Sequence, residues 1–149
     1  AKAALVAIKE SKTKAPVIIS AAVGRGGETM ISAQKVEALW NTFAHIDPLA
    51  VGLNCSLGPD LMEPFLRDLG KAATTHISCY PNAGLPNPLA PTGFDLEPKD
   101  MSDYIAAFAD AGLLNLAGGC CGNTPEHIAA IAKSVKGKAP RSVPTLVTA

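Results

Sequence analysis

The stretch LNLAGGCCGNTPEHI, residues 114–128, places two adjacent cysteines between a short apolar run and an amphipathic one. The run before Cys120 is typical of a buried β-strand, and Thr124 followed by Pro125 is typical of the start of an α-helix. The two cysteines are therefore expected in the turn that follows a strand. The chain has only 4 cysteines, so two in one turn suggest chemistry more than packing.

Outward from this turn, the same order of strand, turn and helix recurs. The expected strands cover residues 16–23, 49–55, 76–80 and 113–119, and the expected helices cover residues 1–11, 32–46 (capped by Ser32), 59–73, 99–112 and 125–135. Alternating strands and helices predict an α/β fold with parallel strands and right-handed crossovers. Four such units make half of an eight-stranded barrel, but an open four-stranded sheet satisfies the same pattern.

The remaining segments concern domain organisation. Residues 81–98 form a proline-rich connection, too long for a plain connector, which predicts a functional loop. Residues 1–141 are expected to form one domain, and residues 142–149 a linker-like tail.

Composition excludes several classes of protein. Of 149 residues, 48% are apolar and 17% are charged, which is typical of a globular domain with a real core. The 13 basic and 13 acidic residues cancel without forming a basic stripe, so no nucleic-acid partner is expected. No apolar run reaches the roughly 18 residues of a membrane span, and unpaired thiols favour the reducing cytoplasm.

The cysteines are the strongest chemical signal. Cys55 ends the second expected strand, and Cys120 and Cys121 end the fourth. Because the carboxyl ends of parallel strands lie at one edge of a sheet, three thiols from distant parts of the chain can converge there. Three thiolates bind zinc and leave one tetrahedral position open, as in catalytic sites. Burial of free cysteines in a core is the alternative explanation.

Other residues near these strand ends have expected roles. Gly118 and Gly119 allow the backbone to bend sharply. Together with Asn54, they are expected to bind substrate or to support the metal ligands. Cys79 is expected to be a core or near-site thiol. His127, in the first turn of the last helix and near the cysteines, is expected to be exposed, and contact with the ligand residues is the alternative.

Three motifs in this order resemble the homocysteine S-methyltransferase family, and most closely its cobalamin-dependent branch, the methionine synthases. They are GLNCSLGP (residues 52–59), YPNAGLPN (80–87) and GGCCGNTPEHI (118–128). The resemblance implies that the chain is the C-terminal half of a (β/α)8 TIM barrel, with about four strands and five helices. Because a domain of that family is about twice as long, a fragment of a larger protein is expected. A dimer that completes the barrel and a rearranged sheet are the alternatives.

The resemblance also implies a function. Cys55, Cys120 and Cys121 would hold zinc, and the sulfur of homocysteine would take the open position, with Asn82 as the fourth ligand at rest. Methylcobalamin on another domain of the same polypeptide, recharged from a methyltetrahydrofolate module, would supply the methyl group, and methionine would be formed. Groups that grip the substrate's amine belong to the other half of the barrel, so the isolated chain's own activity is left open.

Three alternatives remain at this point. The methyl donor could be betaine or S-methylmethionine in place of methylcobalamin. The cysteines could hold zinc in a noncatalytic module. Cys120 and Cys121 could also form a redox pair that needs no metal.

Overall fold

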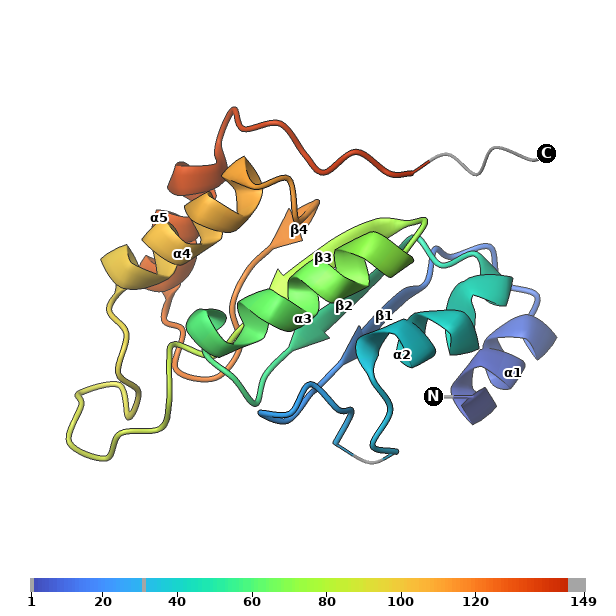
Figure 1. Cartoon of the computed structure of the whole chain (residues 1–149), viewed down its shortest axis with the longest axis horizontal. Coiled ribbons are helices and arrows are strands. Elements are labelled where there is room, and N and C mark those ends of the chain that lie inside the picture. Colours follow the sequence, from blue (N-terminus) through green and yellow to red (C-terminus); the bar gives the residue numbers. More distant parts are fainter. Residues whose placement is uncertain (1, 31, 145–149) are drawn as a thin grey trace.

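The computed structural model describes residues 2–30 and 32–144. The strands are β1 (Ile18–Ala21), β2 (Ala50–Asn54), β3 (His76–Tyr80) and β4 (Leu116–Ala117); the helices are α1 (Lys2–Glu10), α2 (Val36–Phe43), α3 (Pro59–Ala72), α4 (Pro98–Asp110) and α5 (Pro125–Val135), with a 3-10 turn at Ala44–Ile46 (Figure 1). Within the described residues, no helix combines the length and the apolar character needed to cross a bilayer.

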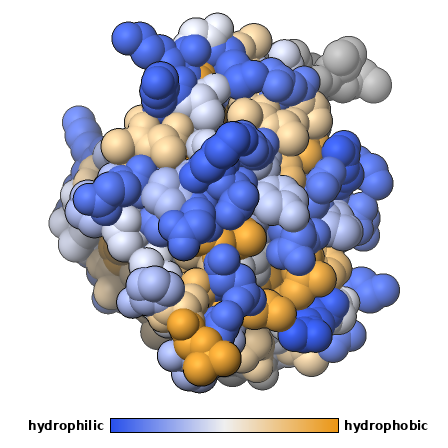
Figure 2. Space-filling view, turned by 90° about the vertical axis from the view of Figure 1, so that its left-hand side faces the viewer, coloured by the Kyte–Doolittle hydropathy of each residue, from blue (hydrophilic) through white to orange (hydrophobic). Residues whose placement is uncertain are grey.

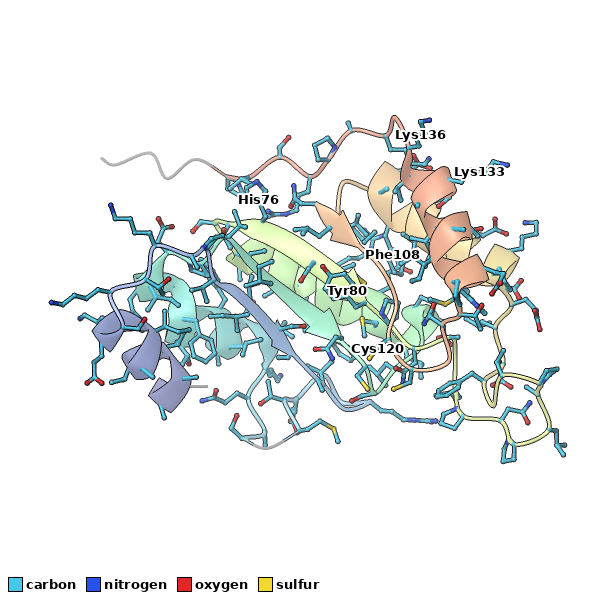
Figure 3. All side chains as sticks on the ribbon, turned by 180° about the vertical axis from the view of Figure 1, so that it is seen from behind. His76, Tyr80, Phe108, Cys120, Lys133 and Lys136 are labelled. Carbon is cyan, nitrogen blue, oxygen red and sulfur yellow. The ribbon has the colours of Figure 1, made fainter. Side chains whose placement is uncertain are left out.

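The four strands form one parallel sheet, in which they follow one another in sequence order. Its strands run β1-β2-β3-β4, and every neighbouring pair is parallel. The order never reverses, as it would in a doubly wound sheet. Seen from behind, one face of the sheet has no helix in front of it (Figure 3), whereas α2 and α3 cover the other face (Figure 1). These features confirm the predicted α/β fold and match part of a TIM barrel.

The helix-covered face of the sheet forms the core. Val51 and Leu53 on β2 and Ile77 and Cys79 on β3 are all 0% exposed. They occupy alternate positions, so their side chains point to the same face. The Cys79 thiol lies 3.7 Å from the sulfur of Met62 in α3, which confirms the expectation of a core thiol. Each buried apolar side chain of this size contributes about 1.5–3 kcal/mol.

The opposite face carries small and polar residues. Gly52 faces Ser78 across the strand pair, and a Cβ atom on Gly52 would lie only 1.9 Å from the Ser78 hydroxyl oxygen. The Ser20 hydroxyl donates a 2.6 Å hydrogen bond to the side-chain oxygen of Asn54. This face corresponds to the interior of the partial barrel.

Two predicted boundaries are wrong for identifiable reasons. Helix α2 begins at Val36 and not at residue 32, because the Ser32 hydroxyl bonds to the Thr29 hydroxyl (2.8 Å) instead of capping a helix. Strand β4 has only 2 residues. The side-chain oxygen of Asn115 accepts the Ile77 N–H (2.9 Å), so a side chain replaces the ladder bond that a longer strand would make.

The segment after α5 is fixed to the amino end of the sheet. Arg141 is 7% exposed, and its guanidinium donates 2.8 Å hydrogen bonds to the carbonyl oxygens of Gly70, Ala73 and Thr75. A cation suits this place because the carbonyls at the end of α3 carry partial negative charge. The proposed domain limit at residue 141 stays a prediction, and residues 145–149 of the predicted tail lie outside the described residues.

The outer surface over α4 and α5 is mainly hydrophilic (Figure 2), as expected for helices that form the outer layer of a barrel. Lys133 and Lys136 extend from this side (Figure 3).

Candidate metal site

A turn in unusual backbone geometry follows β2 and carries Cys55. Cys55 and Ser56 both have left-handed conformations, with φ of 59° and 63°. Non-glycine residues adopt such angles uncommonly, and strained residues of this kind cluster at active sites and ligand-binding turns. The Cys55 N–H still donates to the Tyr80 carbonyl (3.0 Å), so the turn stays attached to the end of β3.

The second turn follows β4 and carries Cys120 and Cys121. It closes at Gly122, where φ is 78°. The Cys120 N–H donates to the Pro81 carbonyl (2.8 Å), and the Cys121 N–H donates to the side-chain oxygen of Asn82 (3.1 Å). Both thiol-bearing residues are therefore held by the segment that leaves β3.

The three thiols meet at the carboxyl edge of the sheet. The Sγ atoms of Cys55, Cys120 and Cys121 all lie within 4.8 Å of one another. The Cys55–Cys121 pair is 3.6 Å apart, and the Cys120–Cys121 pair is 4.0 Å apart. For zinc–sulfur bonds of about 2.3 Å at tetrahedral angles, the sulfurs would lie about 3.8 Å apart. The donor set and its spacing therefore fit a zinc ion.

Hydrogen bonds distinguish the thiols. The backbone N–H of Ser56, with further donation from the two other thiols and from Asn82, holds the pKa of Cys55 below its ordinary value. Donation to Cys55 raises the pKa of the Cys121 thiol to about 11. Without metal, Cys55 therefore ionises at lower pH than Cys121, whose thiol donates to it.

The glycines expected near the site make close approach possible. A Cβ atom on Gly118 would lie 2.7 Å from the Tyr80 ring, and one on Gly119 would lie 2.2 Å from the Asn123 side chain. Asn54 is held by Ser20, as described above. These contacts support the shape of the site, and roles for Gly118, Gly119 and Asn54 in binding substrate stay predictions.

Asn82 links the two turns. It is 5% exposed, its backbone N–H donates to the Leu57 carbonyl (3.0 Å) in the turn after β2, and its side-chain oxygen accepts the Cys121 N–H (3.1 Å). A carbonyl oxygen has two lone pairs, so this bond leaves one lone pair for another partner. Its role as fourth ligand stays a prediction.

Two contributors to the site were missed or misjudged from the sequence. Asn123 donates to the Pro81 (3.1 Å) and Cys120 (3.3 Å) carbonyls and so fixes the turn. An asparagine beside a glycine is typical of turns, which is the only sequence signal for it. The expectation that His127 is exposed is wrong, because it is 1% exposed.

The site lies at one end of the sheet, near the long loop that precedes α4. Cys120 and Tyr80 lie toward one end of the sheet, and His76 lies at the opposite end (Figure 3). Figure 1 shows the long loop before α4 extending beyond this same carboxyl edge.

Comparison with known proteins gives a family match over most of the chain. The family model described as homocysteine S-methyltransferase matches residues 1–135. Among solved structures, the homocysteine methyltransferase MmuM from Escherichia coli is similar in its oxidized form, with a TM-score of 0.66, 23% identity, and coverage of 87% of this chain and 40% of that one. The corresponding values are 0.66, 23%, 88% and 44% for its apo form, and 0.66, 23%, 87% and 39% for its metallated form. The chain thus spans less than half the length of these proteins, and at this identity they support the fold alone.

Proposed function

The chain belongs to the homocysteine S-methyltransferase family, and we propose that its three-cysteine site binds one zinc ion and presents the thiolate of homocysteine for methylation. The observation that carries the proposal is the meeting of Cys55, Cys120 and Cys121 within 4.8 Å. Three sulfur ligands leave one position of a tetrahedral ion for a fourth donor.

Each residue of the site has a task in this scheme. Cys55, Cys120 and Cys121 hold the ion, and Asn82 is the candidate donor for the fourth position when no substrate is present. When bound, zinc acts as a Lewis acid that lowers the pKa of an incoming thiol. The Ser56 N–H, which favours the thiolate of Cys55, would limit the charge that three thiolates build up around the ion.

The reaction is a methyl transfer to sulfur. The thiol proton of homocysteine leaves to solvent, and the sulfur lone pair forms the new S–CH3 bond. The bond between the methyl group and its donor breaks, and its electron pair stays with the donor. The product is methionine.

We further propose methylcobalamin on another domain as the methyl donor. The support is the resemblance of YPNAGLPN, residues 80–87, to the cobalamin-dependent branch, and the position of this segment beside Cys121. Supplying the zinc-loaded chain with methylcobalamin, betaine or S-methylmethionine in turn tests this choice. Methionine formed from methylcobalamin supports this choice, and methionine formed from either other donor would contradict it.

Cobalt-substituted protein tests the proposed thiol binding without turnover. Homocysteine should intensify the sulfur-to-cobalt charge-transfer absorption, because a fourth sulfur joins the ion. Homoserine, which has oxygen in place of that sulfur, is the matched control and should leave the band unchanged. Equal responses to both compounds, or no response to homocysteine, would favour a noncatalytic metal module.

A further inference from the structure

His127, the third residue of α5, uses both of its ring nitrogens. Nδ1 lies 3.1 Å from the backbone nitrogen of Thr124 and 2.9 Å from its hydroxyl oxygen, and Nε2 lies 2.9 Å from the carbonyl oxygen of Leu96. A backbone N–H can only donate and a carbonyl oxygen can only accept. The proton of the neutral ring therefore sits on Nε2, and Nδ1 is the acceptor.

These bonds belong to a closed ring of contacts that includes a thiol-bearing residue. The Ala83 N–H donates to the Cys121 carbonyl (2.9 Å), and the Leu96 N–H donates to the Ala83 carbonyl (3.0 Å). His127 then joins the Leu96 carbonyl to Thr124, from which the backbone leads back to Cys121. Ala83 and Leu96 lie at opposite ends of the 83–97 loop, so His127 fastens the base of this loop to the cysteine turn.

The loop has contacts of its own that make it one unit. The Asn87 side chain donates to the Asp95 carboxylate (2.8 Å), and the Asp95 N–H donates to the Leu85 carbonyl (3.3 Å). The Phe94 ring covers Gly122, where an added Cβ would lie 2.4 Å from the ring. The loop is therefore held together by its own contacts and packs against the turn that carries Cys121.

We propose that His127 is a positioning residue that fixes the 83–97 loop against the cysteine turn. Through this attachment it sets the position of Cys121 relative to Cys55 and places the loop beside the open ligand position. The part that concerns zinc rests on the proposed function, whereas the attachment rests on the described contacts. Residues that hold the metal ligands in place without contacting the metal commonly contribute about 10–100-fold to metal affinity.

Two substitutions of His127 test its hydrogen bonds to Thr124 and to Leu96. His127→Gln supplies an acceptor for the Thr124 N–H and an N–H for the Leu96 carbonyl, and glutamine suits this helical position. His127→Glu keeps the acceptor but places a carboxylate oxygen against the Leu96 carbonyl. His76→Glu makes the same change at an exposed histidine at the other end of the sheet and is the matched control.

Amide hydrogen exchange of the metal-free chain measures the attachment. In His127→Glu, the Ala83 and Leu96 amides should exchange at least tenfold faster (about 1.4 kcal/mol of opening free energy), while β2 amides keep their protection. His127→Gln and His76→Glu should resemble the wild type. Unchanged exchange at Ala83 and Leu96 in His127→Glu would overturn the proposal, as would equal acceleration in His76→Glu.

Zinc affinity, measured by chelator competition, gives the second result. His127→Glu should bind zinc about 10–100-fold more weakly than the wild type, and His127→Gln should recover most of the loss. Wild-type affinity in His127→Glu would overturn the link to the metal. If His127→Glu loses the protection of β2, His127→Met replaces it, with the same expected and contradictory results. A wild-type chain that binds no zinc would refute the proposed function, and the exchange result would still decide the attachment.

Discussion

Cys55, just after β2, and Cys79, within the neighbouring strand β3, are thiols in opposite environments. Cys79 lies within β3 on the helix-covered face, is 0% exposed, and has a pKa raised to about 12 by burial. Cys55 lies one residue beyond β2, and the Ser56 N–H lowers its pKa. A core thiol and a candidate metal ligand thus lie on adjacent strands, only about two residues apart in the register of the sheet.

The difference shows that position relative to the strand end decides what a cysteine can do. Within a strand, alternation directs the Cys79 side chain into a packed, apolar layer. Beyond the strand, the backbone turns and exposes N–H donors, which stabilise a thiolate. Thiolates are the metal-binding form, so only the cysteines past the strand ends suit a metal.

The largest expected effect separates ligand from core thiols. Cys120→Ala should weaken zinc binding by more than about 100-fold, because contacts outside the ligand set already contribute up to that factor. Cys79→Ala should keep the affinity and cost about 1 kcal/mol of stability. Chelator competition and denaturant unfolding measure the two quantities. Loss of zinc binding in Cys79→Ala would break the distinction.

A second pair of substitutions tests the turn that carries Cys121. Gly122→Ala adds a methyl group against Phe94 at a φ of 78°, and should cost about 3 kcal/mol from backbone strain and crowding together. Gly112→Ala has a similar φ of 65° with open space around the added atom, and should cost about 1–2 kcal/mol. Urea unfolding measures both, and equal losses would show that the loop does not press on the turn.

Alkaline pH should reveal the buried thiol. Above pH 9.0, the ordinary pKa of the group, an unfolded chain ionises Cys79 while the folded chain keeps it protonated up to a pKa of about 12. Ionisation thus lowers the free energy of the unfolded state, and stability falls as pH rises through this window, by up to about 1.4 kcal/mol per pH unit. Cys79→Ala should show a shallower fall in unfolding titrations. The same slope in both proteins would place the cause elsewhere.

Alkylation of the metal-free chain gives the finest comparison. Cys55 should react with iodoacetamide at lower pH than Cys121, because the pKa of Cys55 is lowered and that of Cys121 is raised to about 11. Cys79 should stay unmodified in the folded chain. Peptide mass spectrometry across a pH series measures each site, and early labelling of Cys79 would contradict the core assignment.

Much of the fold could be predicted from local patterns. The bounds of β3, the start of α5 after Thr124 and the number of units follow from apolar runs, turn residues and caps, which act within a few residues. The shortening of β4 could not be foreseen, because it depends on the Asn115 side chain bonding to another strand.

The meeting of the three cysteines was also predictable from the sequence, whereas the environment of His127 was not. Parallel strands alone lead one to expect Cys55 beside Cys120 and Cys121. The burial of His127 was not predictable, because its partner, the Leu96 carbonyl, is 31 residues away in a loop without periodic pattern.

X-ray absorption at the zinc edge of the zinc-loaded chain tests the central claim most directly. The account predicts three sulfur neighbours at about 2.3 Å and one lighter donor, unchanged in Cys79→Ala and reduced to two sulfurs in any Cys120→Ala protein that still holds zinc. Fewer than three sulfurs in the wild type, or the loss of one in Cys79→Ala, would contradict it.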